Sequence, residues 1–163
     1  MINVIVIEDN DADFVLARAA VSSHSTQINL SRAETLEEGI NEIMTKSDID
    51  LILVDLHLPD SFGVDTVKKL KSITNMPIVV LTGSDDDDEL IVKSIQCGAF
   101  NYLHKSEMNG NLKRAIITAK AKSDINEEKR EKLLGMIKYY FPTKEKECTH
   151  ESTLEVGAFA TNL

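Results

Sequence analysis

The sequence has few cysteines and a shortage of basic residues, and each shortage excludes a class of protein. Its 163 residues include 27 Asp and Glu against 18 Lys and Arg, a formal net charge of −9. A nucleic-acid-binding surface normally shows as a basic patch or stripe. We therefore expect no direct contact with nucleic acid and a protein partner instead. Cys97 and Cys148 have neither CxxC spacing nor disulfide density, which favours a cytoplasmic location.

Long apolar segments are also missing. No apolar run approaches the roughly 20 residues that span a bilayer, and no charged-then-apolar signal sequence precedes Val4. No segment repeats. With 42% hydrophobic residues, the chain is long enough for one well-buried domain and an appendage. We expect a cytoplasmic protein without a membrane span.

Five short apolar segments predict a parallel sheet. Residues 4–7, 51–54 and 78–81 are continuous apolar runs, as in strands covered on both faces, whereas residues 28–30 and 100–103 alternate like edge strands. This pattern fits the strand order 2-1-3-4-5. Helices between the strands are expected at about residues 12–21, 36–44, 64–73, 89–97 and from near 110.

Four polar clusters follow four of these strands. The clusters are Glu8 with Asp9, then Asp55, then Thr82, then Lys105. The carboxyl ends of parallel strands face one crevice, where ligands bind. We therefore expect these side chains to meet at a single site.

The expected site has the composition of a phosphoryl-transfer centre. Three carboxylates held together repel one another and would be driven toward protonation unless a cation neutralised them. Mg²⁺ suits such a site because it takes one or two carboxylates directly and keeps several waters, and Asp9 and Asp55 are the expected direct ligands. With Asp55 as nucleophile, the metal and the Lys105 ammonium would neutralise a phosphoryl group, and the Thr82 hydroxyl would donate to it. The predicted product is an acyl phosphate on Asp55.

These residues resemble the receiver domain of two-component response regulators over about residues 2–122. The motifs that carry the resemblance are Ile7-Glu8-Asp9-Asn10, Asp55-Leu56-His57-Leu58-Pro59 with Gly63, Leu81-Thr82-Gly83, and Gly98-Ala99 leading to Tyr102 and Lys105. One motif alone is weak evidence, but all of them in order are specific. The resemblance implies a flavodoxin-like (βα)5 α/β fold, a doubly wound parallel sheet with strand order 2-1-3-4-5.

The resemblance also implies a chemical role. In the family, the residue at Asp55 accepts a phosphoryl group from a sensor histidine kinase or a phosphotransfer protein. Such a domain catalyses only its own phosphorylation and dephosphorylation. The family's metal site implies that Mg²⁺ (or Mn²⁺) is held by Glu8, Asp9, Asp55 and the main-chain carbonyl of His57.

A conformational switch is part of the same resemblance. Phosphorylation adds nearly two negative charges, which would draw Thr82 toward the phosphate and let Tyr102 move with it. The surface offered to a downstream protein would then change. Tyr102 alternatively serves only as an edge-strand aromatic. The family usually has Pro after the Lys, often through a cis peptide, and Ser106 stands there instead, which leaves the shape of that loop open.

Several polar residues also have a plain structural interpretation. Glu8, Asp9, Asp11 and Asp13, taken alone, would favour capping of the next helix, but their company with the other polar clusters favours a functional role. The run 85–88 fits the first turn of a helix, where carboxylates interact favourably with the helix dipole. The run 85–88 alternatively shapes which kinase or phosphatase docks. Cys97 is expected to be a small buried hydrophobe. His57 is expected to point to solvent beside the site, where it could affect attack of water on the acyl phosphate.

Two other classes of protein combine similar parts. A haloacid-dehalogenase-type phosphatase also uses an Asp nucleophile, Mg²⁺, a hydroxyl and a Lys, but it needs a second Asp two residues after the nucleophile, where this sequence has His57. A flavin-binding electron carrier needs a loop rich in hydroxyls and Gly after the first strand, where this sequence has carboxylates. The chain alternatively represents the N-terminal receiver of a larger sensor-kinase or cyclic-nucleotide signalling protein.

The last forty residues follow the receiver, which covers residues 1–122 in this interpretation. Residues 123–141 are expected to form a helical extension or linker, and residues 142–163 a mobile tail. Spacing of seven links Leu112, Ala119, Asn126, Leu133 and Tyr140. One long helix satisfies this spacing, whereas Asp124 with Glu127 would alternatively cap a new helix. Residues 124–163 hold six basic against eight acidic residues, which argues against a DNA-binding effector. We expect the extension to mediate homodimerisation or partner docking.

Overall fold

The computed structural model describes residues 1–22, 27–83 and 88–140. Contacts within the chain separate it into two units, residues 1–128 and residues 129–163. The predictions made for Asp85, Asp86, Asp87, Cys148 and the tail 142–163 lie outside the described residues.

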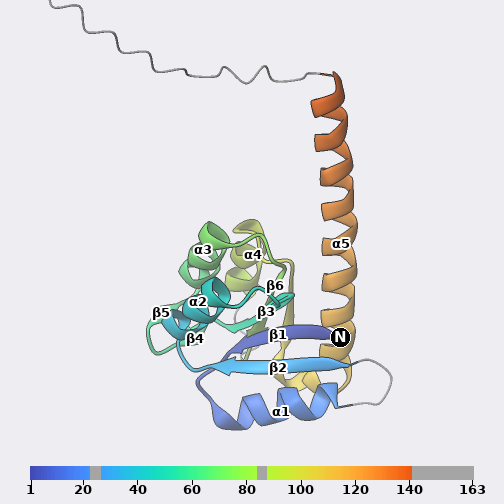
Figure 1. Ribbon diagram of the computed structural model, residues 1–163. Helices are drawn as coiled ribbons and strands as arrows, with labels where there is room; N and C mark the ends of the chain where they lie inside the picture. Colours follow the sequence, from blue (N-terminus) through green and yellow to red (C-terminus); the bar gives the residue numbers. More distant parts are fainter. Residues whose placement is uncertain (23–26, 84–87, 141–163) are drawn as a thin grey trace, which may run out of the picture. The chain divides into compact units, whose positions relative to one another are not determined.

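The first unit is built on a five-stranded parallel sheet (Figure 1). In chain order its strands are β1 (Ile2–Ile7), β2 (Ile28–Ala33), β3 (Leu51–Asp55), β6 (Ile78–Thr82) and β7 (Asn101–His104). Their spatial order is β2-β1-β3-β6-β7, which is 2-1-3-4-5 when only these strands are counted. The predicted flavodoxin-like fold and the two predicted edge strands are confirmed.

Helices cover both faces of the sheet. They are α1 (Asp11–Val21), α2 (Leu36–Thr45), α3 (Val64–Ile73), α4 (Asp88–Gln96) and α5 (Met108–Tyr140). On one face, α1 and α5 bury a core around β1, β3 and β6 that includes Ala17, Leu53, Leu112 and Ile116. On the other face, α2 and α3 bury a second core with Ile7, Leu36, Val54 and Leu70. Alternate residues of each central strand therefore serve opposite cores, which explains the continuous apolar runs.

Helix starts agree with the sequence to within one or two residues, and side chains cap two of the helices. Asn10 caps α1 by accepting from the amides of Ala12 and Asp13. The Thr35 hydroxyl accepts from the Glu38 amide at the start of α2. Gly98 follows α4 with a φ of 103°, which favours glycine.

A short antiparallel hairpin follows β3, and the sequence did not predict it. Its strands are β4 (His57–Leu58) and β5 (Ser61–Phe62). The Asp60 carboxylate at its turn accepts from the amides of Leu36 and Glu37, the first residues of α2. The hairpin therefore supplies a cap for a helix more than twenty residues earlier in the chain.

The last helix settles one of the alternatives left open by the sequence. α5 is a single helix from Met108 to Tyr140, with non-helical dihedral angles only at Asn109. The alternative in which Asp124 caps a new helix is wrong. Its carboxylate instead lies 2.6 Å from the Lys120 ammonium one turn earlier, a pairing that supports a continuous helix. No helix in the described ranges has both the length and the apolar content to cross a membrane.

Candidate functional site

The carboxyl edge of the sheet brings four of the predicted functional side chains together. Asp55 ends β3 and Thr82 ends β6, on neighbouring strands where Asp55 pairs with Leu81. Glu8 follows β1, and Lys105 follows β7 and begins a 3-10 helix, η1 (Lys105–Glu107). Glu8, Asp55 and Thr82 are buried, with exposed fractions of 0%, 5% and 2%.

The Lys105 ammonium lies at the centre of this cluster. Its Nζ is 2.6 Å from Asp55 Oδ2, 2.8 Å from Glu8 Oε2 and 2.8 Å from Asp13 Oδ2. The Lys105 side chain is only 14% exposed. Three carboxylates thus converge on one ammonium, and the cluster keeps an excess of negative charge.

Burial and charge shift the pKa values of this cluster. Desolvation by burial raises the pKa of Glu8, and the neighbouring Asp55 carboxylate raises it further, while Lys105 and the Asn10 amide oppose the rise. Burial lowers the pKa of Lys105, but contacts with the carboxylates of Asp13, Asp55 and Glu8 outweigh it and raise the pKa overall. Lys105 is therefore charged throughout the physiological range. Because the pKa of Glu8 is raised, further positive charge beside it would stabilise its ionised form.

The donor set fits a hard divalent cation. Glu8, Asp9 and Asp55 each present an oxygen, and these oxygens lie within 4.8 Å of one another. Glu8 Oε2 contacts Lys105 but has no well-aligned hydrogen bond among the described residues. An all-oxygen set of carboxylates with residual negative charge is what Mg²⁺ or Mn²⁺ prefers. The three side chains predicted from sequence as metal ligands are thus close enough to share one ion.

The two residues of the predicted switch have different surroundings. The buried Thr82 Oγ1 makes no hydrogen bond to the described residues, and it belongs to the last residue of β6, the strand next to the one that ends at Asp55. Tyr102 is 41% exposed on the edge strand β7, and its ring meets the His104 ring edge-on with centroids 6.0 Å apart. The hydroxyl is therefore buried at the carboxyl edge of the sheet, whereas the aromatic ring is partly exposed.

The predicted solvent position of His57 agrees with the structure. Its side chain is 47% exposed, and its Nδ1 lies 3.7 Å from Asp55 Oδ1. The ring packs edge-on against Phe62 across the hairpin, with centroids 4.8 Å apart. The His57 amide donates to Asp55 Oδ1 at 3.0 Å, so the residue fixes one Asp55 oxygen through its backbone.

Comparison with known proteins assigns this arrangement to a family. The family model for the response regulator receiver domain matches residues 4–117. This chain belongs to the response regulator receiver family. The phosphatase and flavin-carrier alternatives are therefore wrong.

Several relatives of this receiver domain are transcriptional regulators. The KDP operon transcriptional regulatory protein KdpE of Escherichia coli is 31% identical over 73% of this chain and 51% of its own length. The cell cycle transcriptional regulator CtrA of Caulobacter vibrioides is 33% identical over 72% of this chain and 51% of its own. The chain thus spans about half the length of these relatives. A two-component response regulator from Clostridium difficile has a similar structure, with a TM-score of 0.62, 25% identity and coverage of 74% and 94%.

Sequence reasoning assigns Asp13 no partner in the site. Asp13 lies in the first turn of α1. In the structure its carboxylate accepts a hydrogen bond from Lys105, 92 residues away along the chain. The available signal is its place in the first turn after Glu8 and Asp9, because that turn faces the same crevice as the strand ends.

Sequence reasoning also missed Arg32, which secures the loop carrying two of the acids. Its Nε donates to the Glu8 carbonyl at 2.9 Å, and a terminal nitrogen donates to the Asp9 carbonyl at 2.8 Å. The guanidinium also pairs with the Asp11 carboxylate and lies over the Phe14 ring. Arg32 therefore ties the end of β2 to the β1–α1 loop of the receiver domain.

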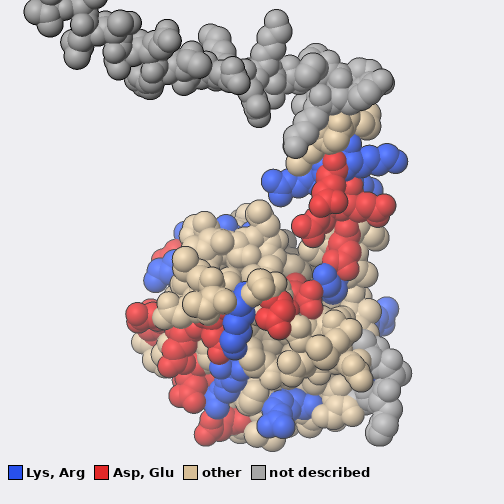
Figure 2. Space-filling model, in the orientation of Figure 1, with Lys and Arg blue, Asp and Glu red and all other residues tan. Residues whose placement is uncertain are grey.

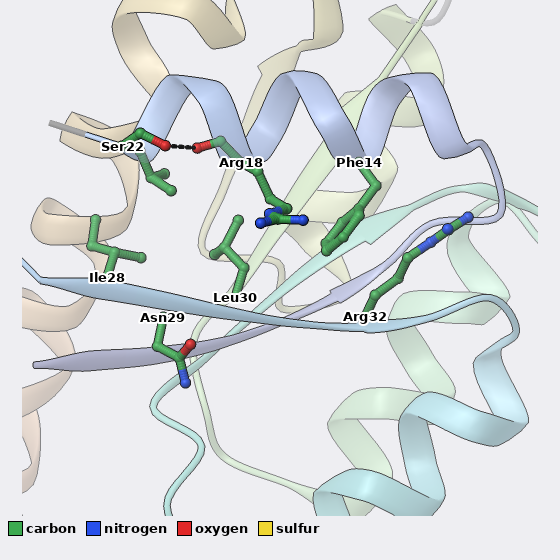
Figure 3. A pocket seen from close by; sticks show the side chains of 8 residues that line it. Phe14, Arg18, Ser22, Ile28, Asn29, Leu30 and Arg32 are labelled. Atoms are coloured by element: carbon green, nitrogen blue, oxygen red, sulfur yellow. Dashed lines mark hydrogen bonds between the residues drawn. The ribbon is translucent and has the colours of Figure 1, made fainter.

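A separate hollow of about 540 Å³ lies between α1 and β2 (Figure 3). Phe14 and Leu30 point into it, and Arg32 lies at its end near Phe14. None of the carboxylates near Lys105 lines this hollow. Its lining residues are Phe14, Arg18, Val21, Ser22, Ile28, Asn29, Leu30 and Arg32. The hollow is therefore distinct from the acidic cluster at the strand ends.

Proposed function

We propose that this receiver domain is a phosphoacceptor in a phosphorelay, with Asp55 as the acceptor. One observation carries the proposal: the buried Asp55 carboxylate contacts the Lys105 ammonium and lies close to the carboxylates of Glu8 and Asp9. The buried Thr82 hydroxyl, at the end of the neighbouring strand, has no hydrogen bond to the described residues. An Asp55 oxygen would form a bond to phosphorus as the bond from phosphorus to the donor breaks. The donor is a phosphohistidine of a histidine kinase or phosphotransfer protein, whose imidazole leaves and takes up a proton.

The remaining residues of the proposed site would neutralise the charge of the phosphoryl group or orient it. Glu8, Asp9, Asp55 and the His57 carbonyl would hold Mg²⁺ or Mn²⁺, which supplies positive charge to the phosphoryl oxygens. Lys105 would pair with one phosphoryl oxygen, and Thr82 would donate to another. The chain would catalyse only its own phosphorylation and dephosphorylation.

The proposal extends to how phosphorylation would signal to another protein. Thr82 would move toward the phosphate on Asp55. Tyr102 would follow Thr82, and the surface of α4, β7 and α5 would present a different shape to a downstream protein partner. We also propose that the chain divides into a receiver (1–122), a helical extension (123–141) and a tail (142–163). The chain would form a homodimer through α5. It would make no direct contact with nucleic acid and would be located in the cytoplasm.

Intact mass spectrometry with acetyl phosphate tests the phosphoacceptor. Wild-type protein with Mg²⁺ should gain the mass of one phosphoryl group, while Asp55→Ala and metal-chelated wild type should gain none. Asp48→Asn removes an exposed carboxylate and is the matched control, which should react like wild type. Asp9→Ala should require far more Mg²⁺, whereas Lys105→Ala should react slowly even when Mg²⁺ is saturating. Undiminished phosphorylation of Asp55→Ala would rule out the mechanism.

A further inference from the structure

The contact between Asp13 and Lys105 is as close as the contact between Glu8 and Lys105. Asp13 Oδ2 lies 2.8 Å from Lys105 Nζ, the same distance as Glu8 Oε2. The two side chains are 21% and 14% exposed. Coulombic attraction is stronger in such partly desolvated surroundings than between fully exposed ions. The pair therefore holds the ammonium toward α1.

Asp13 differs from the other two partners of Lys105 in one respect. Glu8 and Asp55 belong to the group of oxygens close enough to share a metal ion, and Asp13 does not. A divalent cation and the ammonium would therefore compete for Glu8 and Asp55. Among the described residues, Asp13 is the partner that Lys105 can keep while the metal occupies the other two.

We propose that Asp13 is a positioning residue that retains the Lys105 ammonium while a divalent cation binds Glu8 and Asp55, and that it thereby raises the affinity of the site for the cation. The proposal rests on the proposed function for the identity of the site. Without the Asp13 carboxylate, metal binding would leave the ammonium facing a cation with no charged partner of its own. That repulsion would weaken metal binding.

Two variants separate this role from a general loss of negative charge. Asp13→Asn keeps the size of the side chain but removes its charge. Glu107→Gln also removes one negative charge, from an exposed side chain two residues after Lys105. If only the loss of negative charge mattered, both changes would weaken metal binding. If Asp13 acts through Lys105, only Asp13→Asn should weaken it.

Calorimetric titration of the full chain with Mg²⁺, repeated with Mn²⁺, measures the affinity. Asp13→Asn should weaken binding roughly tenfold, the low end of what loss of an orienting partner costs a metal site. Glu107→Gln should stay within about twofold of wild type. In a Lys105→Gln background, adding Asp13→Asn should cost no more than about twofold. Thermal unfolding without metal identifies any variant that does not fold.

Several outcomes of the titration would overturn the inference. A tenfold loss that persists in the Lys105→Gln background would mean that Asp13 acts by charge alone. Equal losses for Asp13→Asn and Glu107→Gln would mean the same. Wild-type affinity in Asp13→Asn, or no metal binding by wild type, would remove the proposed role altogether.

The Mg²⁺ dependence of phosphorylation gives a second measurement that needs only the single variant. With acetyl phosphate, Asp13→Asn should reach half of its maximal rate at roughly tenfold more Mg²⁺, and its maximal rate should stay within about twofold of wild type. An unchanged Mg²⁺ requirement would overturn the role of Asp13 while leaving Asp55 as acceptor. A wild type that binds metal but is never phosphorylated would overturn the proposed function, and the titration would still decide the role of Asp13.

Discussion

At the scale of single residues, long-range polar contacts hold the loops around the site. Arg32 fixes the backbone of Glu8 and Asp9 from the neighbouring strand, and Asp60 fixes the start of α2 from the hairpin. Arg32 donates to backbone carbonyls that follow a strand, and Asp60 accepts from backbone amides at the start of a helix, where no partner within the helix exists. The site is therefore supported by residues that do not belong to it.

Asp60 gives a pH-dependent prediction. Burial raises the pKa of its carboxyl, but hydrogen bonds from the amides of Leu36 and Glu37 outweigh this and hold the pKa below its ordinary value of 3.8. The stabilisation is therefore present at neutral pH and is lost as the pH falls below about 3.8. Asp60→Asn should lower the free energy of unfolding by about 1 kcal/mol at pH 7, as for loss of a helix cap.

Urea unfolding at several pH values measures this effect. The difference between wild type and Asp60→Asn should shrink as the pH falls through the acidic range, because protonated Asp60 resembles the amide. Asp48→Asn, which changes an exposed carboxylate, should show a smaller difference at neutral pH. A difference for Asp60→Asn that is constant with pH would contradict the role of its ionised carboxylate.

The residues that could be predicted from sequence are those whose role depends on strand position. Asp55 and Thr82 were found because each ends a continuous apolar run, and parallel strands share one edge. The contacts of Asp13 and Arg32 were not predicted, because their partners lie 92 and 24 residues away along the chain. A contact at such a separation depends on how a helix or a neighbouring strand is placed, which periodicity does not encode.

At the scale of elements, the helices pack closely enough to restrict residue size. α2 contacts β1 at Gly39, where an added Cβ would lie 2.5 Å from Ile7 Cδ1 and 2.8 Å from Ile7 Cγ1. Ile7 is fully buried in the second core, so it has little room to move. The absence of a side chain at Gly39 thus sets the distance between α2 and the sheet.

Gly39→Ala should therefore destabilise the domain even though alanine favours helix formation. Overpacking of a well-packed core typically costs about 1–3 kcal/mol, more than the roughly 1 kcal/mol that alanine gains over glycine within a helix. Gly110→Ala is the matched control, because no atom lies within 4 Å of its added Cβ. Urea midpoints should fall for Gly39→Ala and stay or rise for Gly110→Ala. Equal stability of Gly39→Ala and wild type would mean that α2 does not pack this closely on β1.

Elements with a strong period were predicted well, and short ones were not. The apolar stripe of Leu112, Ile116 and Ala119 is fully buried, as its spacing indicates. Strands β4 and β5 have two residues each, too few for alternation to show. Cys97 was expected to be buried but is only partly buried, packing against the second core. Its place at the end of α4, next to the turn at Gly98, explains this exposure.

At the scale of the whole molecule, charge argues for a protein partner. The chain has a net charge of −9, and acidic and basic side chains occur in successive bands along α5 (Figure 2). This charge distribution supports the prediction of a protein partner with complementary charges and no direct contact with nucleic acid. Between residues 120 and 140, α5 also exposes Ile125, Leu133, Leu134 and Met136, with exposed fractions of 51%, 57%, 47% and 51%.

These apolar side chains support the prediction that the chain associates with itself through α5. Leu133 continues the spacing of seven that includes Ala119 and Asn126, and such a stripe stabilises a helical pair when a second copy covers it. Asn126 and Arg130 are exposed at the same seam and weaken the pairing, so we expect a dimer that dissociates on dilution and not an obligate one. Sedimentation over a wide range of concentrations should therefore show a monomer–dimer equilibrium for the full chain.

Charged substitutions locate the contact of the expected dimer. Leu133→Glu with Leu134→Glu should abolish it, as should a chain ending at Lys122, because both remove the apolar stripe. Met44→Glu is the control: it changes an apolar side chain on α2 that is more exposed than either leucine, 72% accessible, and it should leave the equilibrium unchanged. A full chain that stays monomeric at every concentration would contradict self-association and leave the α5 stripe to a different protein. A dimer that survives both changes would place the contact outside the extension, on the receiver domain itself.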